Sequence, residues 1–127
     1  MPLSFKERKK ILKEANYLEL TPYRVYKEEI DEKGIVTVLV PKFTNRILVK
    51  FLMPRLKSKY FKIKLDEIGS ETWKHIDGRK NVGQIAEVLT GTFGDKIQPV
   101  YDRLTRFFTR MYMEGYISFN EIKKEGE

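Results

Sequence analysis

The sequence predicts an α+β fold, in which short antiparallel strands precede two short helices and a longer third helix. Residues 24–30 alternate between apolar and polar side chains, and a glycine-containing turn and the apolar run of residues 35–40 follow them, which is typical of a β-hairpin. Residues 65–94 contain two runs of apolar residues at helical spacing, joined by a turn at Asp77 and Gly78. With 127 residues, 41% of them hydrophobic, the chain is long enough to bury the core of one domain.

Three strands are expected, at residues 24–30, 35–40 and 60–65. The first two are joined by a hairpin turn in which Gly34 supplies a positive φ. The second strand is apolar on both faces, which is typical of a central strand, and Pro41 ends it. The third strand alternates strictly between apolar and polar residues, which predicts that one of its faces is exposed.

Capping residues mark the ends of the two short helices. Asp66 is expected to begin the first helix, and the turn that follows this helix is expected to end it. Asn81 and Gln84 form a capping-box pattern at the start of the second helix, and Gly91 is expected to end it. Together the two helices predict a helix-turn-helix unit.

A longer third helix follows this unit. It is expected to be capped by Asp95 or Gln98, with Pro99 in its first turn, and to end at Gly115. A short extended segment at residues 116–119 and a polar, charged tail are expected after it.

Two further segments lie outside this plan. Residues 5–18 predict a highly charged helix or a frayed arm that packs loosely. Residues 43–53 have helical spacing with apolar residues on one face and basic residues on the other, until Pro54 interrupts them. A short helix that covers one end of the core is the expected structure, and attachment to an anionic membrane surface is the alternative.

The net charge of +7 is unevenly distributed. Residues 1–66 contain 16 Lys or Arg and 8 Asp or Glu, whereas residues 67–127 contain 9 and 10. Between residues 33 and 65 there is no acidic side chain, although this segment contains the bases Lys33, Lys42, Arg46, Lys50, Arg55, Lys57, Lys59, Lys62 and Lys64. Such a distribution favours a negatively charged partner, and a solvated basic face is the alternative.

The residue inventory argues against an enzyme. The chain has no cysteine, and His75 is its single histidine, so cysteine chemistry and multi-histidine metal sites are excluded. Gly91 and Gly94 are not followed by the Lys-Ser/Thr pair of a phosphate-binding loop. We therefore assign no catalytic residue and expect no cofactor. No apolar run is long enough for a signal peptide or a transmembrane segment, which predicts a cytoplasmic protein.

Two binding surfaces are predicted instead. Arg103, Arg106 and Arg110 fall on one stripe of the third helix, where they can contact the phosphates and guanines of DNA or form an ordinary solvated face. The third strand, if it lies at a sheet edge, can accept an extended peptide as a further strand, and its basic flank favours acidic peptides. The alternative is an edge strand that binds nothing, whose lysines discourage pairing with other strands. On this prediction, Ile63→Pro removes a backbone donor from the docking edge.

Residues 60–119 resemble the PqqD family of pyrroloquinoline quinone biosynthesis and the wider group of RiPP recognition elements built on the same plan. The matching features are the end of the third strand, the two capped helices and the end of the long helix: residues 63–66, Gly69, Trp73, Ile76, Asp77, Gly78, Val82, Ile85, Ala86, Leu89, Phe93, Gly94 and residues 113–117. With the first hairpin included, the resemblance extends over residues 24–119.

The resemblance implies a winged helix-turn-helix fold, with a three-stranded antiparallel sheet followed by three helices. Two segments depart from this family plan: an N-terminal extension, and an extra helical insertion between strands two and three that the shortest family members lack. The chain is thus divided into an N-terminal helical extension (1–22), a PqqD-like winged-helix domain (23–119, with the insertion at 42–59) and a flexible tail (120–127).

Proteins of this family bind the leader segment of a precursor peptide and present it to a modifying enzyme, commonly a radical S-adenosylmethionine protein. They have no enzyme activity of their own. Carried onto this chain, the family's peptide-binding positions are Tyr60, Lys62, Ile63, Lys64, Arg103, Arg106, Phe107 and Arg110. The predicted partners are thus a precursor peptide, with acidic character favoured, and its modifying enzyme, while a winged-helix protein that binds nucleic acid is the alternative.

Overall fold

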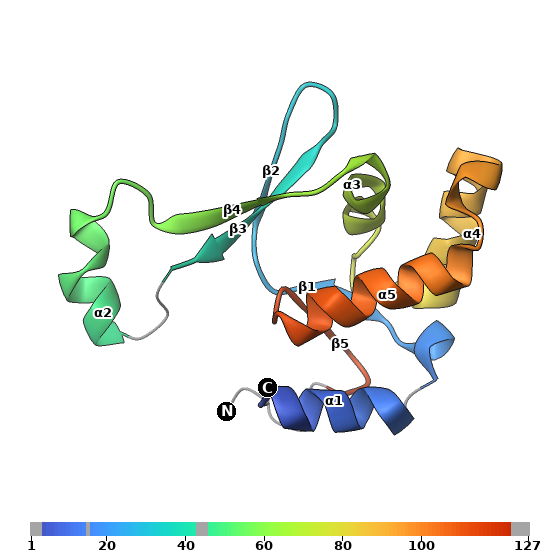
Figure 1. The fold of residues 1–127 in the computed structure, drawn as a ribbon, viewed down its shortest axis with the longest axis horizontal. Coiled ribbons are helices and arrows are strands. Elements are labelled where there is room, and N and C mark those ends of the chain that lie inside the picture. The colour runs from blue at the N-terminus through green and yellow to red at the C-terminus, as the bar shows by residue number, and fades with distance from the viewer. Residues whose placement is uncertain (1–3, 15, 43–45, 123–127) are drawn as a thin grey trace.

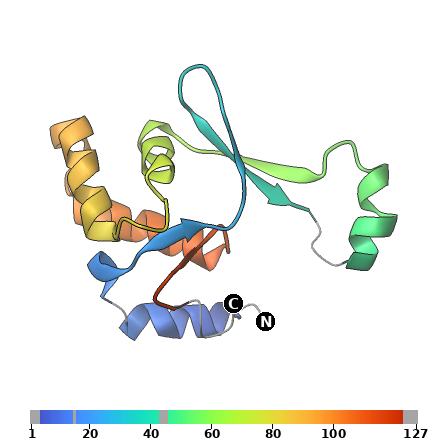
Figure 2. The same cartoon turned by 180° about the vertical axis from the view of Figure 1, so that it is seen from behind.

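The computed structural model describes residues 4–14, 16–42 and 46–122. The fold is α+β, with two small antiparallel sheets and several helices (Figures 1 and 2). In chain order the helices and strands are α1 (Phe5–Glu14), β1 (Pro22–Arg24), β2 (Glu28–Ile30), β3 (Val36–Pro41), α2 (Arg46–Phe51), β4 (Tyr60–Lys64), α3 (Glu67–Lys74), α4 (Val82–Phe93), α5 (Val100–Met113) and β5 (Ile117–Phe119).

The larger sheet has the strand order β2-β3-β4. The predicted hairpin between β2 and β3 is confirmed, and Gly34 in its turn has a φ of 83°. The predicted central position of β3 is also confirmed, because β3 pairs with β2 on one side and with β4 on the other. Val36 and Val38 of β3 are fully buried in the core.

The prediction of one strand over residues 24–30 is wrong. The chain bends after Arg24, and the two halves join different sheets. Arg24 belongs to β1, which pairs with β5 near the C-terminus, and the Val25 N–H donates a hydrogen bond to the Tyr116 carbonyl (3.0 Å). The chain then rejoins the larger sheet, where the Lys27 carbonyl accepts from the Leu39 N–H (2.9 Å). Pairing with β5, which is distant in the sequence, therefore splits the alternating residues 24–30 into two strands.

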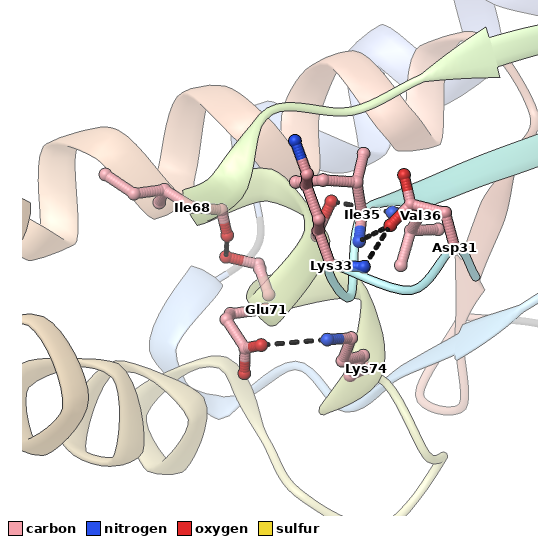
Figure 3. A network of polar contacts seen from close by, with 9 residues as sticks. Asp31, Lys33, Ile35, Val36, Ile68, Glu71 and Lys74 are labelled. Carbon is pink, nitrogen blue, oxygen red and sulfur yellow. Dashed lines mark hydrogen bonds and ion pairs between the residues drawn. The ribbon is translucent and has the colours of Figure 1, made fainter.

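Ser70 of α3 fastens the β2-β3 hairpin to the helices. Its hydroxyl accepts a hydrogen bond from the Val36 N–H (2.8 Å) in a buried environment. In the turn, Asp31 Oδ1 accepts from the N–H groups of Lys33 and Ile35, both at 2.9 Å (Figure 3). The first of these contacts sets the position of the sheet relative to α3, and the other two shape the turn.

The start of each short helix is as predicted. The Asp66 side chain caps α3 by accepting from the Gly69 N–H (2.7 Å), and Asn81 and Gln84 form the full capping box of α4. The predicted end of α4 at Gly91 is wrong, because this helix continues to Phe93 and ends at Gly94, which has a φ of 59°. A glycine inside a helix costs only about 1 kcal/mol relative to alanine, which is too little to end the helix at Gly91.

The predicted start of the third helix is wrong in part. A short 3₁₀ helix occupies Gly94–Ile97, so Asp95 does not cap α5, and Pro99 precedes this helix instead of lying in its first turn. The Gln98 side chain does accept a hydrogen bond from the Val100 N–H at the start of α5 (3.2 Å), although Gln98 does not occupy the N-cap position. The end of α5 is as predicted, since the chain leaves the helix just before Gly115, which has a φ of 81°.

The segment between β3 and β4 is helical, as predicted, but it does not cover the core. Helix α2 lies at the far end of the β3-β4 hairpin, away from α1, α3, α4 and α5 (Figures 1 and 2). Among the residues whose side chains are described, Phe51 and Leu52 remain 59% and 39% exposed, and the core cluster contains no residue from 42–59. Residues 43–45, part of the predicted basic segment, lie outside the described residues.

Helix α1 of the N-terminal extension packs on the body of the molecule, so the predicted helix is formed and the alternative of a frayed arm is not. Arg8 of α1 stacks over the Tyr112 ring of α5 (4.7 Å to the ring centre) and donates to the Tyr112 carbonyl (2.9 Å). Helix α1 ends at Glu14, and a 3₁₀ turn follows at Tyr17–Glu19. No helix in the described part of the chain is long and apolar enough to cross a bilayer.

Candidate functional site

One edge of the larger sheet is formed by β4. This strand pairs with β3 along its whole length, from Pro41↔Tyr60 to Thr37↔Lys64, and no other described strand pairs with it. In an antiparallel ladder, neighbouring residues alternately direct their backbone groups toward the paired strand and away from it. The ladder register therefore decides which residues of β4 offer backbone groups to a further strand.

Hydrogen bonds at both ends of the β3-β4 ladder fix this register. The Lys42 N–H donates to the Lys59 carbonyl (3.0 Å), and the Leu65 N–H donates to the Val36 carbonyl (2.9 Å). Odd-numbered residues of β4 thus direct their backbone groups toward β3, and even-numbered residues direct theirs toward the open edge. Pro41, which has no N–H, sits opposite an even-numbered residue, where no ladder bond is needed.

The open backbone groups belong to Lys62 and Lys64. Tyr60 is also even-numbered, but Ser58 occupies its backbone: the Tyr60 N–H donates to Ser58 Oγ (3.3 Å), and the Ser58 hydroxyl donates to the Tyr60 carbonyl (3.0 Å). The expectation that proline at Ile63 would remove a docking donor is wrong, because the Ile63 N–H points at β3. Proline at Lys62 is the substitution that removes a donor from the open edge.

A groove of ≈560 Å³ lies beside the end of β4, between this strand, α3 and α5. Its lining residues are Ile63, Lys64, Leu65, Asp66, Ile68, Gly69, Thr72, Arg103, Leu104, Arg106, Phe107, Arg110 and Met111. The end of β4 and the arginine stripe of α5, which the sequence suggested as separate surfaces, therefore border one groove.

The floor of the groove is apolar. Leu65, Leu104 and Met111 are buried there and join the main core. Gly69 leaves room for the Asp66 cap beside this floor, because a Cβ at this position would lie only 3.0 Å from Asp66 Oδ1, whereas its distance of 3.4 Å from Phe107 Cε1 would be an ordinary contact. The half-buried Phe107 ring packs on this floor and also contacts Phe108 edge-on, with ring centres 5.5 Å apart.

The rim of the groove is basic. Four of the lining side chains are bases and one, Asp66, is an acid that is already engaged in capping α3. Arg106 forms an exposed ion pair with Asp102 (3.3 Å), whereas no described residue forms an ion pair with Arg103 or Arg110. An exposed pair of this kind contributes at most about 1 kcal/mol, so Arg106 can leave Asp102 to bind another carboxylate.

Most of the predicted site residues lie together. Six of the eight line the groove, namely Ile63, Lys64, Arg103, Arg106, Phe107 and Arg110. Tyr60 and Lys62 do not line it: they lie farther along β4, where Lys62 is 3.6 Å from Glu29. The prediction missed the other seven lining residues of the groove. Two of them, Ile68 and Thr72, are four residues apart on the first helix, and this spacing is the signal that could have placed them on one face.

The described residues contain no cluster of three or more His, Cys, Asp or Glu side chains that could hold a metal ion. The electrostatic feature closest to a catalytic pattern is Asp77, whose pKa is held well below its usual 3.8 chiefly by the backbone N–H of Lys80. This carboxylate organises the turn between α3 and α4, since it also accepts from the Arg79 N–H (2.9 Å). Its role is therefore structural.

Comparison with protein families identifies the region that contains the groove. The family described as Coenzyme PQQ synthesis protein D (PqqD) matches residues 50–117, which is more than half of the chain. The chain belongs to the PqqD family. No curated protein and no solved structure matches it.

The matched region includes all of β4, α3, α4 and α5, and hence every residue that lines the groove. It begins within α2 and excludes β1, β2 and β3, so the family match is shorter than the predicted range of 24–119. PqqD is a non-catalytic accessory protein of coenzyme PQQ synthesis, and the prediction that this chain is not an enzyme agrees with its membership.

Proposed function

We propose that this protein binds the leader segment of a precursor peptide as an added strand on β4 and presents it to a modifying enzyme. The observation that carries the proposal is the open edge of β4, where the backbone groups of Lys62 and Lys64 have no partner among the described residues. An extended peptide forms up to four main-chain hydrogen bonds with two such residues.

The groove supplies the specificity that backbone bonds lack. A peptide strand on the edge beside Lys64 runs along α5, where alternate side chains can enter the apolar floor at Leu104 and Phe107. Side chains that leave the floor meet the arginines of the rim, which bind carboxylates bidentately. We therefore propose a peptide with apolar residues at every second position and acidic residues near them.

The fold itself fits this role. We interpret α3, α4 and α5 with the β3-β4 hairpin as a winged helix-turn-helix arrangement, in which the two short helices hold the strand beside the long helix. Radical S-adenosylmethionine proteins are the proposed class of partner enzyme, as the family membership favours. The protein contributes binding and orientation, and the enzyme contributes the chemistry.

Peptide display provides the test, because it requires no knowledge of the natural precursor. A library of extended peptides is selected on the wild-type protein, and the affinity of an enriched peptide is then measured by fluorescence anisotropy for Lys62→Pro and for Lys62→Ala. Both variants lose the Lys62 side chain, but only the proline also loses the N–H. We expect wild-type affinity to be nearly kept by Lys62→Ala and to fall about tenfold with Lys62→Pro, since one hydrogen bond is worth about 1 kcal/mol or more. Equal affinities for the two variants would rule out strand addition.

DNA binding through the arginines of α5 is the second candidate, because Arg103, Arg106 and Arg110 are all exposed. Binding to duplex DNA would fall steeply with salt and would not depend on the Lys62 N–H. Peptide binding by strand addition is expected to depend on peptide sequence and to fall only modestly with salt, since main-chain hydrogen bonds contribute beside the arginines. A salt titration of the selected peptide and of an arbitrary duplex separates the two functions.

A further inference from the structure

Between β3 and β4, the described residues Lys42 and 46–59 form an arm that stands apart from the rest of the molecule (Figures 1 and 2). The sequence from residue 42 to residue 59 contains six basic residues and no acidic residue. Only one of its described apolar side chains, that of Met53, is buried. Val49, Phe51, Leu52 and Leu56 are between 36% and 59% exposed. Four exposed apolar side chains within eight residues of one arm favour an interaction surface there.

Cations and apolar groups alternate closely on this arm. Lys50 Nζ lies 5.8 Å from the centre of the Phe51 ring, and Lys42 Nζ lies 5.5 Å from the centre of the Phe61 ring at the neighbouring start of β4. Lys57 and Lys59 are exposed between them. No ion pair holds any of these ammonium groups among the described residues, so all of them can face an anionic partner.

We propose that the arm binds the surface of an anionic phospholipid bilayer. In this arrangement Phe51 and Leu52 enter the boundary between headgroups and acyl chains, and the surrounding lysines contact lipid phosphates. Four of the six bases of the arm are lysines. Lysine is depleted from protein interfaces, whereas a diffuse cluster of lysines suits a fluid anionic surface. Nucleic acid would use the cations but would have no need of several exposed aliphatic side chains.

The position of the arm keeps this surface separate from the peptide groove. Helix α2 lies at one end of the β3-β4 hairpin, whereas α3 and α5, which line the groove, lie at the other (Figure 1). A protein held on a bilayer by α2 would therefore leave the groove open to solvent. The proposal does not rest on peptide binding, and each can fail without the other.

Vesicle flotation tests the proposal with the full-length protein. The wild type is expected to float with phosphatidylcholine vesicles that contain phosphatidylglycerol and to stay behind with phosphatidylcholine alone. Lys50→Glu/Lys57→Glu should weaken binding about thirtyfold or more, since each base near the surface contributes about 1 kcal/mol. The matched control is Lys10→Glu/Lys96→Glu, which makes the same change in net charge at two exposed positions on the body and should bind nearly as the wild type does.

A second variant separates lipid from other anions. Phe51→Ser/Leu52→Ser keeps every charge and should lose about tenfold or more of the vesicle affinity, because the apolar contact is removed. Unchanged emission from the buried Trp73 verifies that each variant is folded. Equal binding to both kinds of vesicle, or an equal loss in the control on the body, would overturn the proposal. So would duplex DNA binding that outcompetes vesicles and is unaffected by the two serines, which would assign the arm to nucleic acid.

Discussion

Two proline substitutions one residue apart on β4 are expected to differ strongly in their effect on stability. The Ile63 N–H faces β3, opposite Val38, which is fully buried. Ile63→Pro removes this donor and leaves a buried carbonyl without its partner, at a cost of about 1–3 kcal/mol. The loss of the half-buried isoleucine side chain adds about 1–2 kcal/mol. The free energy of unfolding should therefore fall by about 2–5 kcal/mol.

Lys62→Pro should cost far less. The Lys62 N–H faces the open edge, where proline is tolerated in native sheets. The substitution also removes the ion pair with Glu29, but both side chains are more than half exposed, so this pair contributes at most about 1 kcal/mol. We expect the free energy of unfolding to change by less than about 1 kcal/mol.

Urea unfolding followed by the fluorescence of Trp73 measures both effects. Trp73 is the single tryptophan, is fully buried and donates from Nε1 to Glu28 of β2 (2.9 Å), so its emission reports on the packing of the sheet against α3. Ile63→Ala and Lys62→Ala are the matched controls, since each removes the side chain and keeps the N–H. If Lys62→Pro destabilises as much as Ile63→Pro when each is compared with its alanine control, the register of the β3-β4 ladder is wrong.

Three further predictions concern the supports and the rim of the groove. Ser70→Ala should lower the free energy of unfolding by about 1–3 kcal/mol, measured in urea, because the buried Val36 N–H loses its acceptor. The lowered pKa of Asp77 contributes to the free energy of unfolding. This contribution is fully present above pH 3.8, the usual pKa, and is lost as pH falls through the folded-state pKa. In acid titrations of unfolding, the free energy of unfolding should therefore fall less for Asp77→Asn than for the wild type. Arg103→Glu/Arg110→Glu should weaken a selected acidic peptide about tenfold or more in anisotropy, with little change in stability. An unchanged affinity would show that these arginines do not take part in peptide binding.

The sequence was most informative where structure is decided locally. The caps at Asp66 and Asn81 depend on hydrogen bonds within three residues, and both are confirmed. The glycines at 34 and 115 likewise have the positive φ that a turn and a helix end require. The resemblance to PqqD also depended on such local features, and the family match confirms it.

Long-range contacts decide what the sequence could not. The division of residues 24–30 between two sheets requires β5, which lies more than 80 residues farther along the chain. The amphipathic pattern of residues 43–53 correctly indicated a helix. Such a pattern cannot say which surface the apolar face contacts, and no described residue of this segment belongs to the core cluster. In the same way, alternation predicted a strand at 60–65, whereas the register with β3 was needed to identify its open backbone groups.

Amide hydrogen exchange on β4, measured residue by residue by NMR, tests the central proposal most directly. Without peptide, the amides of Ile63 and Leu65 should be protected by the ladder, and those of Lys62 and Lys64 should exchange quickly. Addition of a selected peptide should slow exchange at Lys62 and Lys64 and leave the pattern at Ile63 and Leu65 as it was. Peptide binding that leaves Lys62 and Lys64 exchanging as quickly as before would contradict the account.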